Sequence, residues 1–215
     1  GTIANNMNSP PFPNATNQDT LLGMNTGLNN CTGNCSGWTS NGRIGNGLAF
    51  DGVNDYVDAG NNASLNITNE ITASVWVNTN NLTKEGGIIS KYAGVRSWAL
   101  ITIPNTRFEW ITYNNSSVQK RMIINKALPI NSWHHIAVTF NSSIKGFYLD
   151  GVQTTSSDTG SDILMTPQNV IIGNYISNVY SFNGSIDEVR IYNRALSASE
   201  IAILYNTSLK STGNI

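Results

Sequence analysis

The sequence predicts an all-β domain, folded as a sandwich of two antiparallel sheets with one short C-terminal helix. Short segments with alternating or β-branched residues recur along the chain, and turns rich in Gly, Asn, Asp and Ser separate them. Strand patterns near both ends, Gly47–Val57 and Gly184–Asn193, indicate that one sheet brings these two segments together. The 215 residues, 40% of them hydrophobic, are enough for the core of a single domain of this class.

The closing segment has the pattern of one strand followed by one short helix. Alternation along this strand places its side chains on two faces, with Ile186, Glu188, Arg190 and Tyr192 on one and Asp187, Val189, Ile191 and Asn193 on the other. Ser197 then has the position of a helix N-cap, and Glu200 is its expected N3 partner. This capping box predicts that a helix begins here and carries the apolar residues Ile201, Leu204 and Tyr205.

The first part of the chain has a different composition. Residues 1–20 are rich in Asn, Pro and Thr and lack apolar periodicity, which predicts a linker or stalk, so the folded domain is expected to span residues 21–215. Cys31 and Cys35 lie four positions apart with Gly33 between them. In an extracellular protein they are expected to close a small disulfide ring. Half of a metal site is the alternative interpretation.

The middle of the chain supplies most of the predicted strands. In Ile71–Val77, alternation directs four apolar side chains toward the core and Trp76 toward the opposite face. Asp150–Gly151 predicts a tight turn. The other predicted strands are Leu48–Phe50, Asp55–Ala59, Gly86–Tyr92, Ser97–Ile103, Arg107–Tyr113, Val118–Ile124, Trp133–Phe140, Lys145–Leu149, Val152–Thr155 and Val170–Gly173.

Several spaced motifs resemble one known family. The early GLAFDGVNDYV and the closing GSIDEVRIYNRALSASEI resemble the LamG-like jelly-roll domains of the laminin-G and concanavalin A-like lectin/glucanase superfamily. ITASVWVN, GGIISKY, SWHHIAVTF, GFYLDGVQ and VIIGNY follow in the expected order, so the resemblance covers roughly residues 47–205. It implies a two-sheet antiparallel jelly roll, but it implies no particular ligand, because this fold carries many functions.

The charge of the chain excludes some classes of partner. The net charge is −1, from 12 basic and 13 acidic residues without a run of either sign. A nucleic-acid surface would need a basic stripe, so no nucleic-acid partner is expected. The chain has neither a polybasic patch nor an apolar run of ~20 residues, so no direct membrane insertion is expected.

Asparagine is abundant, and many asparagines stand in Asn-X-Ser/Thr triplets. In a secreted eukaryotic or archaeal protein these would be glycan acceptors on surface loops. The alternative is that an Asn-rich chain contains such triplets by chance. The Asn-rich composition and the cysteine pair together favour an extracellular or cell-surface protein. The triplets begin at Asn14, Asn30, Asn34, Asn62, Asn66, Asn81, Asn114, Asn115, Asn141, Asn183 and Asn206.

A structural calcium ion is the first candidate ligand. Related jelly rolls often hold one calcium between an early loop and the aspartate of the last strand, and the resemblance carries this site to Asp187. The backbone around Gly45–Gly47, with Gly47 as the chosen ligand, or the side chain of Asp51 would complete it with further oxygen ligands. The alternative is that Asp51 only makes a turn and that Asp187 is hydrogen-bonded or paired with Arg190. The loop 174–183 has no carboxylate, so a second, pentraxin-like calcium site is not expected.

Carbohydrate is the second candidate ligand. Aromatic rings stack on the C–H faces of sugars, while Asn and Arg side chains bind hydroxyl groups. We expect these roles from residues near strand ends and in the loop 174–183, namely Tyr92, Arg96, Tyr175, Asn178 and Tyr180. Trp98 and Trp110 alternate with core-like neighbours and are expected to fill the sandwich.

The sequence argues against catalysis. A glycosidase needs two carboxylates that flank one bond, yet Asp187 and Glu188 are adjacent and Glu109 stands alone. His134 and His135 are adjacent too, so they cannot easily bind one ion together. We therefore predict a non-enzymatic recognition module, part of a larger adhesin-like protein, that binds a glycan or a cell-surface protein. The alternatives are a structural or adhesive spacer and a glycan-degrading enzyme.

Overall fold

The computed structural model describes residues 2–3, 25–26, 37–93, 95–105, 107–114, 116, 118–124, 126, 128–158, 163–164, 166–176 and 179–210. Except for Thr2 and Ile3, the predicted linker lies outside these ranges. Cys31, Cys35 and Asn178 lie outside them as well, so the expected disulfide and the expected role of Asn178 stay predictions.

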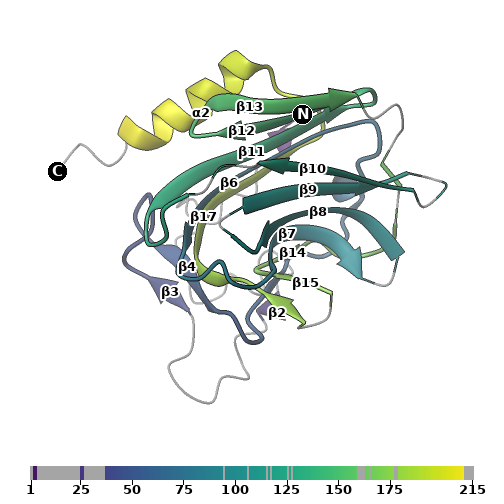
Figure 1. The fold of residues 1–215 in the computed structure, drawn as a ribbon. Coiled ribbons are helices and arrows are strands. Elements are labelled where there is room, and N and C mark those ends of the chain that lie inside the picture. Colours follow the sequence, from purple (N-terminus) through teal and green to yellow (C-terminus); the bar gives the residue numbers. More distant parts are fainter. Residues whose placement is uncertain are drawn as a thin grey trace.

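Two antiparallel sheets face each other and form the predicted sandwich (Figure 1). The sheet that carries the C-terminal helix, here called the back sheet, has eight strands in the described part of the chain. Their order is β13 (Val152–Asp158), β12 (Ile144–Leu149), β11 (Trp133–Asn141), β6 (Glu70–Thr79), β17 (Asn183–Tyr192), β4 (Gly47–Asp51) and β3 (Trp38–Thr39), with β1 (Thr2–Ile3) also paired to β17.

The opposite sheet, here called the front sheet, has seven strands within the described ranges. Their order is β10 (Gln119–Ile124), β9 (Arg107–Tyr113), β8 (Val95–Ile103), β7 (Gly86–Ala93), β14 (Ile171–Ile172), β5 (Val57–Asp58) and β2 (Asn25–Thr26). A short hairpin, β15 (Asn174–Tyr175) and β16 (Tyr180–Ser181), joins β14 to β17, and a 3₁₀ helix spans Ala63–Leu65. The predicted all-β antiparallel class is therefore confirmed.

Apolar side chains from both sheets form one buried cluster between them. The four apolar residues of β6 that alternation directs inward, Ile71, Ala73, Val75 and Val77, all belong to this cluster. Trp98 and Trp110 lie in it too, with ring centroids 5.6 Å apart. These two tryptophans fill the core, so neither offers a ring face to a ligand.

Strand β17 confirms that the early and closing segments share one sheet. Its first half pairs with β4, from Asn183 opposite Asp51 to Ile186 opposite Leu48. Its other edge pairs with β6 along most of its length. Phe50 and Val189 consequently lie in the same core.

The predicted strict alternation along this strand is wrong at one point. A bulge between Asp187 and Arg190 shifts the register against β6, and Glu188 has a positive φ of 51°. The extra residue reverses the facing of the side chains that follow it. As a result Ile186 and Val189 point into the same core, although alternation places them on opposite faces.

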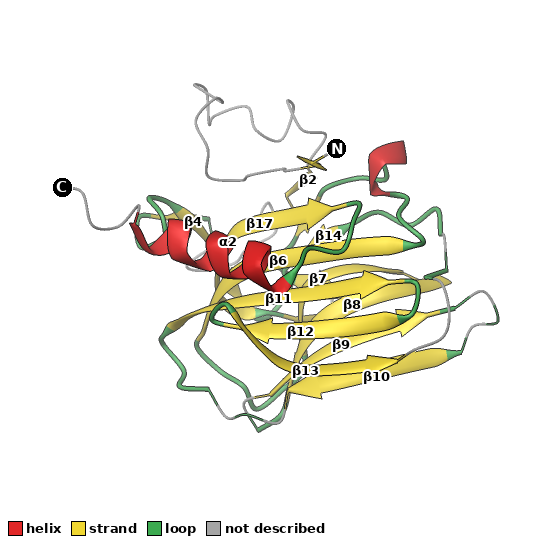
Figure 2. Cartoon of the chain, turned by 90° about the horizontal axis from the view of Figure 1, so that it is seen from above, coloured by secondary structure: helices red, strands yellow, loops and turns green. Residues whose placement is uncertain are grey.

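The C-terminal helix α2 (Ala198–Lys210) lies across the outer face of the back sheet (Figure 2). Its predicted capping box is present: the Glu200 N–H donates to Ser197 Oγ at 3.3 Å, and the Ser197 N–H donates to the Glu200 carboxylate at 2.8 Å. Tyr205 stacks on Trp76 with ring centroids 5.6 Å apart. No described helix is long and apolar enough to cross a membrane.

Gly87 provides a test of how closely the hairpin β15–β16 packs on the front sheet. A Cβ at this position would lie 2.3 Å from the carbonyl carbon of Asn174 and 2.5 Å from the Tyr175 nitrogen. Gly87→Ala is therefore expected to push the hairpin backbone away and to lower the free energy of unfolding by about 1–3 kcal/mol. Urea unfolding followed by tryptophan fluorescence measures this loss.

Gly37→Ala is the matched control, because a Cβ there meets no atom within 4 Å. We expect this control to unfold like the wild type. A Gly87→Ala variant as stable as the control would contradict the close contact between the two backbones.

Candidate functional site

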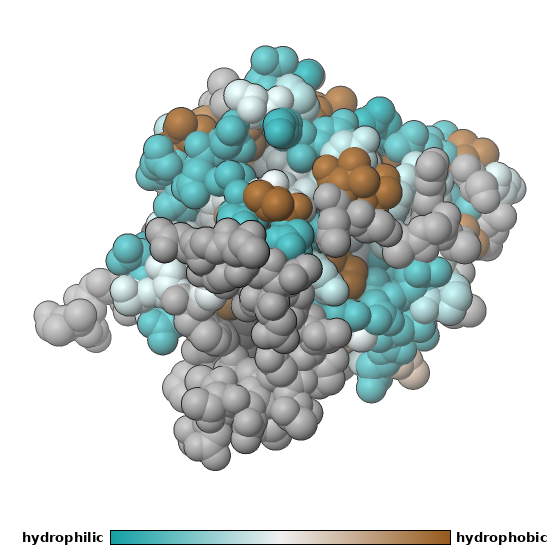
Figure 3. Space-filling model, turned by 90° about the horizontal axis from the view of Figure 1, so that it is seen from below, coloured by the Kyte–Doolittle hydropathy of each residue, from teal (hydrophilic) through white to brown (hydrophobic). Residues whose placement is uncertain are grey.

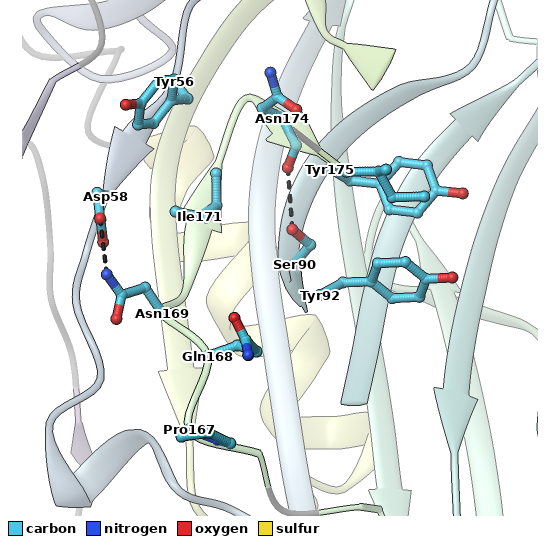
Figure 4. A pocket seen from close by; sticks show the side chains of 11 residues that line it. Tyr56, Asp58, Ser90, Tyr92, Pro167, Gln168, Asn169, Ile171, Asn174 and Tyr175 are labelled. Atoms are coloured by element: carbon cyan, nitrogen blue, oxygen red, sulfur yellow. Dashed lines mark hydrogen bonds between the residues drawn. The ribbon is translucent and has the colours of Figure 1, made fainter. Parts of the chain in front are cut away.

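A pocket of about 480 Å³ opens on the front sheet, on the face turned away from the core. It lies where β5, β14 and β7 run side by side, because Ile171 pairs with Asp58 on one side and with Ser90 on the other. Ile171 and Ser90 line the pocket between two walls of different chemistry (Figure 4).

One wall of the pocket is aromatic. Tyr92 and Tyr175 line it, with ring centroids 5.0 Å apart in an edge-on arrangement. Tyr113 supports Tyr92 from behind, through a 3.1 Å contact between the two hydroxyl oxygens, and Tyr180 stacks on Tyr175. Burial raises the pKa of Tyr175 to about 12, so its hydroxyl stays protonated at neutral pH.

The opposite wall is polar. Asp58 Oδ2 accepts a hydrogen bond from Asn169 Nδ2 at 2.8 Å, and Asp58 Oδ1 accepts one from the Gly60 N–H at 2.8 Å. Tyr56 and Gln168 also line the pocket (Figure 4 labels both). The bonds at Asp58 hold the carboxylate in a fixed direction and leave each oxygen with a lone pair for a ligand.

A short hydrogen-bonded chain joins the hairpin to its surroundings. Ser90 Oγ donates to the Asn174 carbonyl at 3.0 Å, and Asn174 Nδ2 donates to Ser181 Oγ at 3.1 Å. Ser181 Oγ in turn donates to the Val53 carbonyl at 2.8 Å. The hairpin that carries Tyr175 is therefore tied both to β7 and to the turn after β4.

The structure brings together part of the predicted sugar site. Tyr92 and Tyr175 line the pocket, whereas Tyr180 contacts it only through Tyr175. The backbone of Arg96 pairs with Tyr92, but the Arg96 side chain lies outside the described part of the chain. The sequence analysis did not expect four other lining residues in the site, namely Tyr56, Asp58, Gln168 and Asn169. The one sequence feature that could have indicated two of them is alternation, which places Tyr56 and Asp58 on the outward face of a predicted strand.

The described surface of the molecule is mostly hydrophilic on the face seen from below (Figure 3). Seen from below, hydrophobic residues form separate small patches among hydrophilic ones (Figure 3). Val53 and Val179 are 65% and 67% exposed, and both belong to turns joined through Ser181. Such scattered residues are normal on a surface, so this view gives no evidence for a large apolar interface.

Asp187 and Gly47, two of the predicted calcium ligands, are neighbours. A Cβ added at Gly47 would lie 3.7 Å from the Cβ of Asp187. The Asp187 carboxylate is fully buried, and it accepts the Ile44 N–H at 2.9 Å and the Glu188 N–H at 2.6 Å. These two N–H donors suit a carboxylate that anchors a loop, and a calcium ion at Asp187 stays a prediction.

Asp51, the third predicted ligand, lies elsewhere. Asp51 pairs with Asn183, which lies four residues before Asp187 in the same strand. Four residues of an extended strand span roughly 13 Å, so Asp51 and Asp187 are separated by about that distance. Asp51 Oδ1 accepts the Val53 N–H at 2.7 Å, which is the turn interpretation of this residue. Among the described residues, no group of three or more His, Cys, Asp or Glu side chains could hold a metal ion.

The residues that line the pocket include one carboxylate and not two. Asp58 is the single carboxylate that lines the pocket. Arg121 binds both oxygens of the buried Glu109, with Nη2 at 2.5 Å from Oε2, and Glu188 is paired with Arg190. His135 packs on Trp76 and contacts Ser74 Oγ at 2.8 Å.

The fold and pocket define a two-sheet antiparallel β-sandwich domain of the concanavalin A-like type. The chain belongs to the concanavalin A-like lectin/glucanases superfamily, whose profile matches residues 51–202. This match confirms the resemblance seen in the sequence motifs. A comparison with curated protein sequences gives no significant match.

Solved structures with the same fold include three binding domains. The botulinum neurotoxin serotype G binding domain is 18% identical with a TM-score of 0.69, and the match covers 86% of this chain and 46% of that one. The binding domain of Paraclostridial Mosquitocidal Protein 1 is 19% identical, with a TM-score of 0.68 and coverage of 80% and 45%. The botulinum neurotoxin serotype D ligand binding domain, in complex with N-acetylneuraminic acid, is 20% identical, with a TM-score of 0.68 and coverage of 86% and 45%.

These identities show a shared fold and no more. The chain spans less than half the length of each of these structures. The position of the ligand in the serotype D structure is therefore not transferred to this chain.

Asp187 predicts a defined dependence of stability on pH. Burial raises the pKa of Asp187 to about 7 in the folded chain, whereas the pKa of an unfolded aspartate is about 3.9. Between these values the folded state binds a proton that the unfolded state does not, so this residue adds stability as the pH falls from about 7 to about 4. Relative to Asp187→Asn, the wild type should gain on the order of 2–4 kcal/mol across this window, as measured by urea unfolding.

A constant difference between the wild type and Asp187→Asn would contradict this prediction. The same two proteins test the expected calcium ion. If the ion binds at Asp187, added Ca²⁺ should raise the melting temperature of the wild type and not that of the variant. A wild-type melt that responds to neither EDTA nor Ca²⁺ would reject the expected ion.

Proposed function

We propose that this domain is a non-enzymatic glycan-recognition module and that a sugar binds in the pocket between Tyr56 and Tyr175. The observation that carries the proposal is the pairing of an aromatic wall with a hydrogen-bonding wall across one preformed pocket. A sugar presents both C–H faces and hydroxyl groups, so it complements both walls at once. The proposal places the domain outside the cell, within a larger surface or secreted protein.

The geometry of the pocket supports binding without large rearrangement. Its floor is a paired sheet, and its aromatic wall is supported by Tyr113 and Tyr180. Preorganised side chains lose little conformational entropy when a ligand binds. The volume of about 480 Å³ is within the usual range of small-ligand sites, which is about 300–1,000 Å³.

The same pocket argues for recognition and against hydrolysis. Glycosidases of the two-carboxylate type need a general acid and a second carboxylate across the scissile bond. Asp58 stands alone among the residues that line the pocket. The superfamily includes glucanases, but all three neighbours above are binding domains, and this also favours recognition.

A glycan array tests the proposal together with two pocket variants. Tyr56→Ala removes an aromatic face, and Asn169→Ala removes an exposed amide from the polar wall. Each is expected to weaken binding of the glycans recognised by the wild type by about fivefold to tenfold, since one lost hydrogen bond or stacking contact is worth about 1–1.5 kcal/mol. Isothermal titration with the best glycan from the array measures the change.

Asn206→Ala is the matched control, because Asn206 is another exposed asparagine but lies on α2, which covers the other sheet. It should bind like the wild type. If the wild type binds no glycan on the array, the proposal is rejected and a structural or adhesive spacer is favoured. Turnover of a polysaccharide would reject the assignment as a non-enzyme.

A further inference from the structure

Resting on the proposed glycan site, we propose that the pocket selects uncharged sugars and excludes sugars that carry a carboxylate. The inference concerns the class of glycan and follows from the charge of the pocket. The inference can fail while the proposed glycan site stands, but it cannot hold without that site.

The pocket carries one fixed negative charge. Among the eleven residues that line it, Asp58 is the single charged one. The bonds from Asn169 and from the Gly60 N–H hold both of its oxygens in place. In Figure 4 this carboxylate lies across the pocket from the aromatic pair, so a bound sugar ring would lie between them.

The nearby described cations are directed elsewhere. Lys91 stands between two residues that line the pocket, Ser90 and Tyr92, yet its side chain is buried on the other face of β7. There its Nζ donates to the side-chain oxygens of Asn61 and Asn66. Arg121 binds both carboxylate oxygens of Glu109. Neither side chain lines the pocket, so neither would neutralise an acidic ligand there.

The charge of Asp58 is the basis for the proposed selectivity. A ligand carboxylate brought close to Asp58 would be repelled, since the repulsion between like charges grows as their distance falls. A uronic acid or N-acetylneuraminic acid would bring its own carboxylate toward Asp58, and none of the described side chains that line the pocket would supply a countercharge. A neutral sugar would instead donate its hydroxyl hydrogens to Asp58 and accept hydrogen bonds from the amides of Gln168 and Asn169.

The test is an array that pairs neutral glycans with counterparts that carry a terminal uronic acid or N-acetylneuraminic acid. The wild type should bind the neutral members, with affinities at least about tenfold higher than for their acidic partners at low salt. Asp58→Asn keeps an acceptor for the Gly60 N–H but removes the charge, so the acidic partners should gain affinity while the neutral ones change little. High salt should narrow the wild-type difference, because salt screens the repulsion.

Arg96 supplies the decisive second variant, because its backbone pairs with Tyr92 beside the pocket. If Arg96 provides a cation for acidic sugars, the wild type will prefer them and Arg96→Gln will lose that preference. This outcome would overturn the proposed selectivity for uncharged sugars. If Asn169→Ala also weakens binding of the acidic sugars, the proposed glycan site still stands. A wild type that binds no member of the array overturns both proposals, and thermal melts of every variant identify any loss of folding.

Discussion

The pairing of β17 with both β4 and β6 is the constraint on which the rest of the structure depends. β17 joins the early segment of the chain to the middle of the back sheet, and it contributes Ile186 and Val189 to the core. Asp187 follows the inward-facing Ile186, so it points outward and accepts the Ile44 N–H. This hydrogen bond fixes the loop before β4 to the last strand, across a sequence separation of more than a hundred residues.

The pocket depends on the same strand through the hairpin that precedes it. The Phe182 N–H donates to the Gly173 carbonyl at 2.9 Å, and Asn183 Nδ2 donates to the Asp51 carbonyl at 3.0 Å. These bonds fix both ends of the short segment that presents Asn174 and Tyr175 to the pocket. The aromatic wall is thus a consequence of how the chain enters its closing strand, because the hairpin cannot move without breaking the start of β17.

The longer strands and the C-terminal helix are predictable from sequence because they follow from local patterns, whereas the hairpin β15–β16 lies in what was expected to be a loop. β6 alternates without interruption, and the capping box of α2 needs only Ser197 and Glu200. The bulge was not predictable, since the sequence from Ile186 to Tyr192 alternates without a mark at Glu188. The pocket was predicted only in part, because Tyr92 and Tyr175 were the expected lining residues. The polar wall depends on the pairing of β14 with both β5 and β7. No local sequence pattern specifies such a register.

In the strands beside this pocket, residues that line the pocket alternate one by one with residues that lie in the core. Val57 lies in the core between Tyr56 and Asp58, and Val170 lies in it between Asn169 and Ile171. The buried valines fix the backbone, so the side chains on either side are held in place without taking part in core packing. Substitutions at Tyr56, Asp58 or Asn169 can therefore change which ligand the pocket accepts while the sandwich keeps its stability. This separation gives a physical reason why one fold can serve many recognition functions, and why the ligand must be argued from the pocket and not from the family.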